Sequence, residues 1–154
     1  MTQDPVRALM SVDVEDWFQV ENLRGAISRE SWSARELRVE ANTHLVLDIL
    51  DRNGTKATFF VLGWVAERLA PLVGAIHARG HEVACHGYGH QLLYELTPAQ
   101  FREDVGRCKA ILEDITGEAV RGYRAPSFSI TDWALEALLE LGFRYDSSLF
   151  SCTD

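Results

Sequence analysis

Residues 81–90 have the sequence HEVACHGYGH, in which a short apolar run leads directly into two glycines set between two histidines. The run from His81 to Cys85 has the length and composition of a buried strand. His86 and His90 can reach one metal ion if the glycines let the backbone turn, and histidine is the commonest metal ligand near neutral pH. The alternative is a glycine-rich turn with two exposed imidazoles.

Short apolar runs and amphipathic stretches alternate on both sides of this segment. The pattern predicts strands over residues 9–12, 58–62, 81–85, 120–124 and 143–146, and helices over 41–53, 64–79, 97–115 and 131–141. This alternation is typical of a parallel α/β fold, whose functional side chains gather at the carboxyl ends of the strands.

Three local features refine the helices. Pro71 should kink the second helix or start a new one. Thr97, followed three positions later by Gln100, predicts a capping box at the start of the third. The first helix should bury one face, formed by Leu45, Val46, Ile49 and Leu50.

Asp13, Glu15 and Asp16 place three carboxylates within four positions at the end of the first expected strand. Their mutual repulsion costs stability, and a metal ion or a shared proton would relieve it. In an extended chain Asp13 and Glu15 point the same way, whereas Asp16 joins them only if the backbone bends. A solvated acidic turn is the alternative.

Two further segments follow expected strands. Arg124, in the sequence RAPSF, can hold a carboxylate by a two-pronged hydrogen bond. Pro126 would fix the next turn and leave nearby N–H groups free to bind an oxyanion. The alternative is that the RAPSF segment is an ordinary loop. Asp146 can orient a catalytic partner or pair with Arg124.

The bulk composition excludes some functions. The chain has 154 residues, is 47% hydrophobic and carries a formal net charge of −8, which fits one folded domain and disfavours nucleic acid as a partner. Its three cysteines form no CxxC pair, which favours a reducing compartment. The segment Met1–Arg7 is short and polar, and no stretch is long enough to span a bilayer. We therefore expect a cytoplasmic protein, which could act at the inner face of the membrane.

Together these motifs resemble the polysaccharide deacetylase family with the NodB homology domain (carbohydrate esterase family 4). The resemblance rests on the order and spacing of SVDVEDWF, HGYGH, RAPSF and DSS, with ATFFVLGWVAE between the first two. The DVEDWF variant is most similar to the subgroup linked to bacterial exopolysaccharide gene clusters. The resemblance implies a distorted (β/α) barrel of about seven strands, of which this chain would hold an N-terminal portion of about five. It therefore implies a single, truncated domain over residues 1–154.

The resemblance also implies a hydrolase that removes N-acetyl groups from a glycan with a divalent metal, usually zinc. His86 and His90 match the two histidine ligands. The acidic ligand is Glu15 if the strand alternates regularly, or Asp16 if the chain bends. Asp13 matches the base that takes a proton from water, and Arg124 would orient it.

Four residues near these motifs are expected on the substrate or oxyanion side, namely Tyr88, Pro126, Ser127 and Phe128. Ser127 stands where the family usually has an aromatic residue. The family's Leu-x-x-His motif, whose histidine would protonate the leaving amine, lies beyond residue 154. An open barrel edge would favour self-association. The alternatives are a hydrolase of a non-sugar amide on the same barrel and an inactive remnant.

Overall fold

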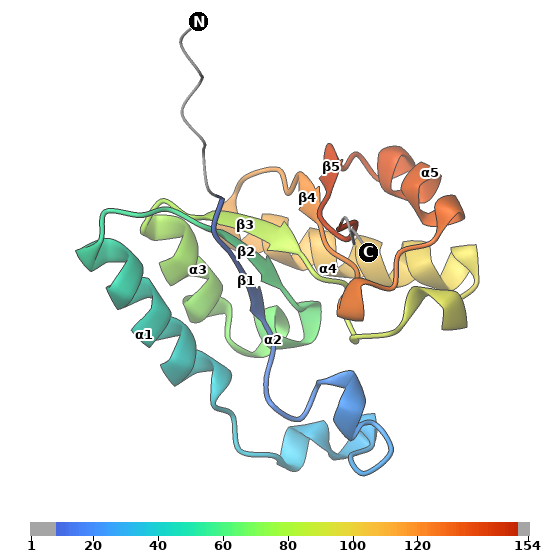
Figure 1. Ribbon diagram of the computed structural model, residues 1–154, viewed down its shortest axis with the longest axis horizontal. Coiled ribbons are helices and arrows are strands. Elements are labelled where there is room, and N and C mark those ends of the chain that lie inside the picture. The colour runs from blue at the N-terminus through green and yellow to red at the C-terminus, as the bar shows by residue number, and fades with distance from the viewer. Residues whose placement is uncertain (1–8, 151–154) are drawn as a thin grey trace, which may run out of the picture.

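The computed structural model describes residues 9–150, so the segment Met1–Arg7 and Cys152 lie outside the described residues. Its centre is a five-stranded sheet in which all neighbours are parallel and the strands follow chain order. The strands are β1 (Ser11–Val14), β2 (Thr58–Val61), β3 (Glu82–Cys85), β4 (Gly122–Tyr123) and β5 (Tyr145–Asp146) (Figure 1). The expected parallel α/β architecture with five strands is confirmed.

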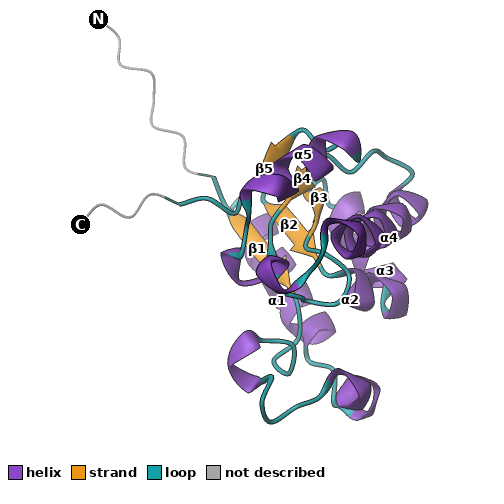
Figure 2. Ribbon diagram, turned by 90° about the vertical axis from the view of Figure 1, so that its right-hand side faces the viewer, coloured by secondary structure: helices purple, strands orange, loops and turns teal. Residues whose placement is uncertain are grey.

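Helices connect the strands: α1 (Val39–Arg52), α2 (Gly63–Arg68), α3 (Ala70–Ala78), α4 (Pro98–Thr116) and α5 (Asp132–Glu140). Since right-handed crossovers join strands that are also neighbours in the sheet, the helices fall on one of its faces. The segment between β1 and α1 contains the 3-10 turns Glu21–Leu23 and Arg29–Ala34 and lies beyond the carboxyl end of β1 (Figure 2, bottom).

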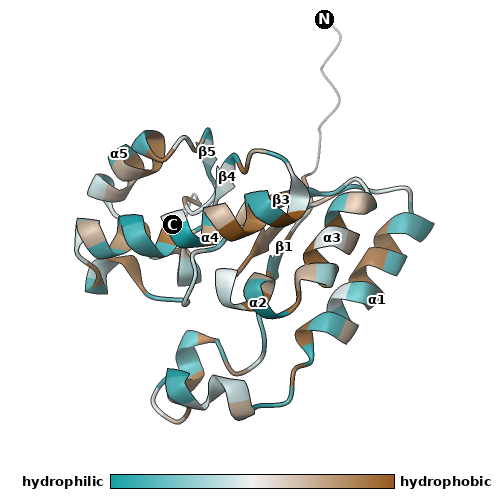
Figure 3. Ribbon diagram, turned by 180° about the vertical axis from the view of Figure 1, so that it is seen from behind, coloured by the Kyte–Doolittle hydropathy of each residue, from teal (hydrophilic) through white to brown (hydrophobic). Residues whose placement is uncertain are grey.

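Strand residues alternate between the helix-covered face and the opposite face. The core under the helices includes Val14, Phe59, Val61, Val83 and Cys85 from the strands, with Leu47, Ile76, Val105 and Leu112 from the helices. In Figure 3, hydrophobic and hydrophilic stripes alternate along α1 and α4, as expected for helices with one face on a sheet. The opposite face, which would be the interior of a barrel, carries polar groups toward the carboxyl ends of the strands.

Two sequence-based expectations about the first elements are wrong. β1 begins at Ser11 rather than residue 9, so Asp13 lies inside the strand, and Leu9 is 95% exposed. In α1 the buried residues are Val39, Thr43, Leu47 and Leu50, whereas Leu45 and Ile49 are 61% and 50% exposed. The apolar residues of this helix lie on more than one side, and the sheet covers only one of them.

Other helix predictions hold. The expected helix over 64–79 is two helices, because the backbone breaks at Leu69 and Pro71 sits in the first turn of α3. α4 begins with the complete capping box, in which the Thr97 side chain accepts from Gln100 N–H and the Gln100 side chain accepts from Thr97 N–H. Within residues 9–150, no helix is long and apolar enough to cross a membrane.

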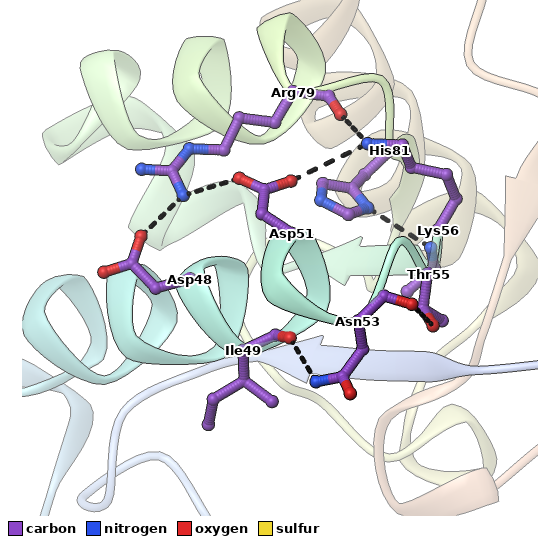
Figure 4. A network of polar contacts seen from close by, with 9 residues as sticks. Asp48, Ile49, Asp51, Asn53, Thr55, Lys56, Arg79 and His81 are labelled. Atoms are coloured by element: carbon purple, nitrogen blue, oxygen red, sulfur yellow. Dashed lines mark hydrogen bonds and ion pairs between the residues drawn. The ribbon is translucent and has the colours of Figure 1, made fainter.

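A charged network at the amino end of the sheet joins the last turns of α1 and α3 (Figure 4). Arg79 donates to the carboxylates of Asp48 and Asp51 at 2.7 and 3.1 Å, and Lys56 donates to the Arg79 carbonyl at 2.6 Å. Exposed ion pairs contribute only ~0–1 kcal/mol each. The network therefore adds little stability, and it lies at the end of the sheet away from the candidate site.

Candidate metal centre

Strand register brings the predicted motifs to one face and one edge of the sheet. Asp13 is opposite Phe60 in β2, and Cys85 is opposite Tyr123 in β4. Since alternate residues of a strand share a face, Asp13 points to the side away from the helices. His86 and Arg124 follow Cys85 and Tyr123 by one position and lie on that same side. The parallel sheet thus joins residues more than a hundred positions apart in the chain.

Glu15, His86 and His90 form a compact cluster at this edge. One ligand atom from each lies within 4.8 Å of the others, and Oε2 of Glu15 is 2.7 Å from Nε2 of His90. His86 donates its Nδ1–H to the carbonyl of Arg124 at 2.8 Å. Because a carbonyl can only accept, this contact fixes the tautomer of His86 and leaves Nε2 free to bind a metal.

The electrostatics of the cluster suit a cation. Burial lowers the pKa of His86, so its imidazole stays neutral at neutral pH, the form that binds metals. Burial opposes ionisation of Glu15, but the neighbouring His90 and His86 rings hold its pKa below the ordinary value. Oε2 of Glu15 has Nε2 of His90 as its close polar contact, and Nδ1 of His90 is buried without a hydrogen-bond partner among the described residues. These side chains therefore fit a divalent metal.

Asp16, the alternative acidic ligand, points elsewhere. Its carboxylate accepts hydrogen bonds from the backbone N–H groups of Arg38 and Val39 at 2.8 and 3.1 Å, and from Trp17 N–H at 2.9 Å. Arg38 is the N-cap residue of α1 and Val39 is its first residue, so Asp16 supplies the cap that the Arg38 side chain does not. The expectation that a bend would bring Asp16 to the metal side is not met, because the chain turns it toward α1.

Asp13 and Arg124 form a close pair beside the cluster. Nη1 of Arg124 lies 2.7 Å from Oδ1 of Asp13, while Nη2 donates to the hydroxyls of Ser11 and Ser147 at 3.0 and 2.8 Å. The guanidinium also lies 4.1 Å from the ring centroid of Phe60. Hydrogen bonds and the aromatic face thus fix Arg124, which in turn fixes one oxygen of Asp13.

Asp146 does not pair with Arg124. It is in register with Tyr123, so it points to the helix-covered face while Arg124 points to the other. Its carboxylate instead accepts from the N–H and hydroxyl of Ser148 at 2.9 and 2.6 Å, and the Ser148 hydroxyl accepts from Ala125 N–H at 2.8 Å. Asp146 therefore braces the loop after β4 and does not touch Asp13.

Asp104, on α4, holds the HGYGH turn and was not among the predicted site residues. Its carboxylate accepts from Tyr88 N–H at 2.7 Å and from Gly89 N–H at 3.1 Å, and burial raises its pKa. The available signal was an acidic residue on the apolar face of a helix, three positions after Phe101 and four before Cys108. A buried carboxylate at such a position needs donors, and the turn supplies them.

Tyr88, predicted on the substrate side, points into the seam between α2 and α4. Its hydroxyl donates to Glu67 at 2.7 Å, and the guanidinium of Arg107 lies 3.7 Å from its ring centroid. Gly87 has a φ of +74°, which turns the chain immediately before Tyr88 and directs its side chain away from the histidines. The expectation for Tyr88 is therefore not met, and its ring instead anchors the turn to the helices.

The first residues of α2 clamp the same turn. Gly63 N–H donates to the carbonyl of Gly87 at 2.8 Å, and Trp64 N–H donates to the carbonyl of Tyr88 at 3.0 Å. A Cβ at Gly63 would lie 2.7 Å from Cδ2 and 3.1 Å from Cα of Tyr88. Only glycine allows this close approach of the two backbones.

We predict that Gly63→Ala destabilises the protein by about 1–3 kcal/mol, because the new methyl group must push the turn away from α2. Gly74→Ala is the matched control: Gly74 lies inside α3 with nothing within 4 Å of its added Cβ. That change should be neutral or stabilise by up to ~1 kcal/mol. Urea unfolding of both variants tests the contrast, and equal free energies of unfolding would contradict it.

The loop after β4 contains the remaining predicted residues. Pro126 is buried, and Ser127 and Phe128 have positive φ of 49° and 57°, a conformation that costs about 1–3 kcal/mol each in residues other than glycine. The N–H groups of Phe128 and Ser129 bond within the turn, to the carbonyls of Ala125 and Pro126. The Phe128 side chain is 43% exposed, 5.3 Å from the Arg124 guanidinium. The strain and exposure make this loop a candidate substrate contact.

A parallel α/β sheet that carries a carboxylate and two histidines at its carboxyl edge defines a parallel α/β protein with a candidate metal centre. Residues 33–145 match the model of the polysaccharide deacetylase family, and the chain belongs to that family. The matched residues include His86, His90 and Arg124 and begin after Asp13 and Glu15.

Relatives agree with this assignment. The chain is 33% identical over 150 residues to a peptidoglycan deacetylase-like protein of Gibberella zeae, covering 94% of this chain and 44% of that protein. It is 33% identical over 104 residues to a peptidoglycan deacetylase of Helicobacter pylori, covering 68% and 36%. A crystal structure from Mycobacterium smegmatis, provisionally assigned as a polysaccharide deacetylase, matches with a TM-score of 0.77 and 30% identity over 92% of this chain and 50% of that one. The chain thus spans half or less of the length of these proteins.

Proposed function

We propose that this protein removes N-acetyl groups from a glycan by metal-dependent hydrolysis. The observation that carries the proposal is the juxtaposition of the Glu15, His86 and His90 cluster with the Asp13–Arg124 pair at one edge of the sheet. The first group has the composition of a catalytic metal site with an open position, and the second has that of an oriented base. Membership of the polysaccharide deacetylase family supports the choice of an acetylated glycan over another amide.

The chain's own residues would divide the work. Asp13 accepts the proton of the attacking water at the carboxylate oxygen that Arg124 leaves free, because Nη1 of Arg124 engages only Oδ1. The N–H of Ser127 would donate to the developing oxyanion, since Pro126 has no N–H and the N–H groups of Phe128 and Ser129 are already used in the turn. When bound, a divalent metal at Glu15, His86 and His90 would supply Lewis-acid polarisation of the acetyl carbonyl and of water.

Zinc is the metal we propose, because two imidazoles and one carboxylate match its preferred ligands and leave a fourth position open. The DVEDWF sequence further favours a bacterial exopolysaccharide as substrate. Phe128, exposed beside Arg124, would contact the sugar. The cytoplasmic location, the single truncated domain and self-association through the open edge stay predictions.

The test is acetate release from chitotetraose by the zinc-loaded full-length protein and by its Asp13→Asn variant. We expect the variant to lose about 100- to 10,000-fold in kcat, the range that a general base contributes, while it keeps its zinc. Asp114→Asn is the control, because Asp114 is exposed on α4 and away from the cluster. A panel of small formamides and cyclic ureides, assayed in parallel, measures the alternative amide hydrolase. An unchanged rate in Asp13→Asn would contradict the role of Asp13, and zinc binding without acetate release from any glycan would favour the inactive remnant.

A further inference from the structure

A pocket of about 290 Å³ adjoins the metal cluster and is not used by the proposed chemistry. It lies between the segment that follows β1 and the chain just after His90, and its lining includes Phe18, Arg24, Arg29, Trp32, His90 and Glu95. The volume is close to the lower end for ligand pockets, ~300 Å³, which suits a single sugar residue. Because His90 belongs to both the pocket and the cluster, a ligand here would lie next to the group bound at the metal.

Some charged side chains of this pocket form ion pairs with each other, and Arg29 does not. Arg24 contacts the carboxylates of Glu95 at 2.6 Å and Glu21 at 3.4 Å, so these three groups largely satisfy one another. Glu30 is exposed to solvent on the rim, where its charge is screened. Arg29 has no carboxylate within 4.0 Å among the residues from 9 to 150. It is therefore the cation of the pocket that remains available to an anion.

The Arg29 guanidinium lies between the HGYGH turn and Trp32. A Cβ added at Gly89 would lie 3.3 Å from Nη1 of Arg29, so the absence of a side chain at Gly89 makes room for the guanidinium beside the HGYGH turn. On another side Cζ lies 5.7 Å from the ring centroid of Trp32. Partial burial lowers the pKa of Arg29, and the charge of the Asp104 carboxylate opposes that shift, so the guanidinium stays charged. Asp104 itself is engaged by the N–H groups of Tyr88 and Gly89. A partly desolvated cation without a close partner favours binding of an anion.

We propose that this pocket is a subsite for a carboxylate-bearing sugar, and that Arg29 binds the carboxylate. The natural substrate would then be an acidic glycan, in which the acetylated residue at the metal is followed by a residue with a uronic or lactyl carboxylate. The inference rests on the proposed function for the residue at the metal. Arg29 acts here as a specificity residue, because it contacts the neighbouring sugar and not the acetyl group.

The test measures binding by calorimetry to the zinc-loaded full-length protein, with two matched pairs of ligands. A hyaluronan tetrasaccharide is compared with its carboxyl-reduced form, and the disaccharide of N-acetylglucosamine and N-acetylmuramic acid is compared with its methyl ester. We expect the acid of at least one pair to bind about five- to tenfold more tightly than its uncharged form at low salt. This factor corresponds to a charge-assisted hydrogen bond at a partly exposed site. The preference should be smaller at high salt, because salt screens the charges. The pair that shows the preference distinguishes the uronic from the lactyl source.

Arg29→Gln should remove this preference, while Arg35→Gln should keep it. Arg35 is the matched control, because it is exposed in the same segment but does not line the pocket. Zinc affinity should not change in Arg29→Gln. Equal affinity of the native protein within both pairs, or no measurable binding of either acid, would overturn the proposal. So would a parallel loss of zinc and of all ligands in Arg29→Gln, which would make Arg29 a support of the turn.

Acetate release from chitotetraose, which is neutral, is measured separately. It is also measured from the hyaluronan tetrasaccharide and from the acidic disaccharide. Absence of acetate release from all three, alongside a preserved acidic preference, would count against the deacetylase and leave the subsite standing. Acetate release without any preference for the acidic ligands would support the deacetylase and contradict the acidic subsite.

Discussion

Replacing His86 or His90 with alanine is expected to abolish tight zinc binding. Each change removes one of the three proposed ligands, and a centre with two ligands left holds zinc poorly. Mutations of outer groups that merely orient a ligand already cost ~10–100-fold in metal affinity, so the loss of a ligand should exceed that range. Zinc stoichiometry after dialysis, and competition with a chromogenic chelator, measure the effect. Undiminished stoichiometry in both variants would rule out the centre.

The controls separate metal loss from misfolding. His44 is a partly exposed residue of α1, and His44→Ala should keep its zinc. Both ligand variants should also lose stability without metal, because each histidine makes one close polar contact. His86→Ala leaves the Arg124 carbonyl without its donor, which costs about 1–3 kcal/mol. His90→Ala removes the contact of Nε2 with Oε2 of Glu15 at 2.7 Å and leaves that partly buried carboxylate without its partner, so it should also unfold at lower urea than the native protein.

Local sequence signals predicted those parts of the molecule that depend on neighbouring residues. The β3 strand and the two histidines after it lie in one continuous segment, and the pattern of 81–90 places them correctly. The capping box at Thr97 and the break near Pro71 are likewise encoded within a few positions. The contact between Arg124 and Asp13 follows from the parallel strands, whose carboxyl ends lie at one edge of the sheet. The alternation of helices and strands in the sequence already implied that arrangement.

Features that depend on tertiary packing could not be predicted from the sequence. Asp146 is in register with Tyr123, so its side chain points to the face opposite to that of Arg124. Strands of two residues are too short to give a periodic sequence pattern from which this register could be predicted. The buried face of α1 was misassigned because Leu45 and Ile49 are as apolar as the residues that the sheet covers. Asp104 acts on a turn some fifteen residues earlier, a partnership visible only once α4 packs against that turn.

The choice between Glu15 and Asp16 is the clearest case where structure separates adjacent carboxylates, and it predicts opposite behaviour of two variants. Glu15→Ala should lose zinc affinity by more than ~100-fold, since it removes a ligand. The metal-free variant should lose less stability than Asp16→Ala, because the Glu15 carboxylate has one close polar contact, from Oε2 to Nε2 of His90 at 2.7 Å, whereas that of Asp16 accepts three hydrogen bonds. Chelator competition and urea unfolding measure the two quantities independently.

Asp16→Ala should do the reverse. Its carboxylate accepts from the backbone N–H groups of Trp17, Arg38 and Val39, and its removal leaves the start of α1 uncapped, at a cost of about 2–3 kcal/mol. Asp16→Asn, which keeps one oxygen acceptor, should lose less. Once corrected for the unfolded fraction, zinc affinity should change little in both variants. Loss of zinc in Asp16→Ala with unchanged stability would reverse the assignment, because the residue that binds metal cannot also hold its carboxylate on the first N–H groups of α1.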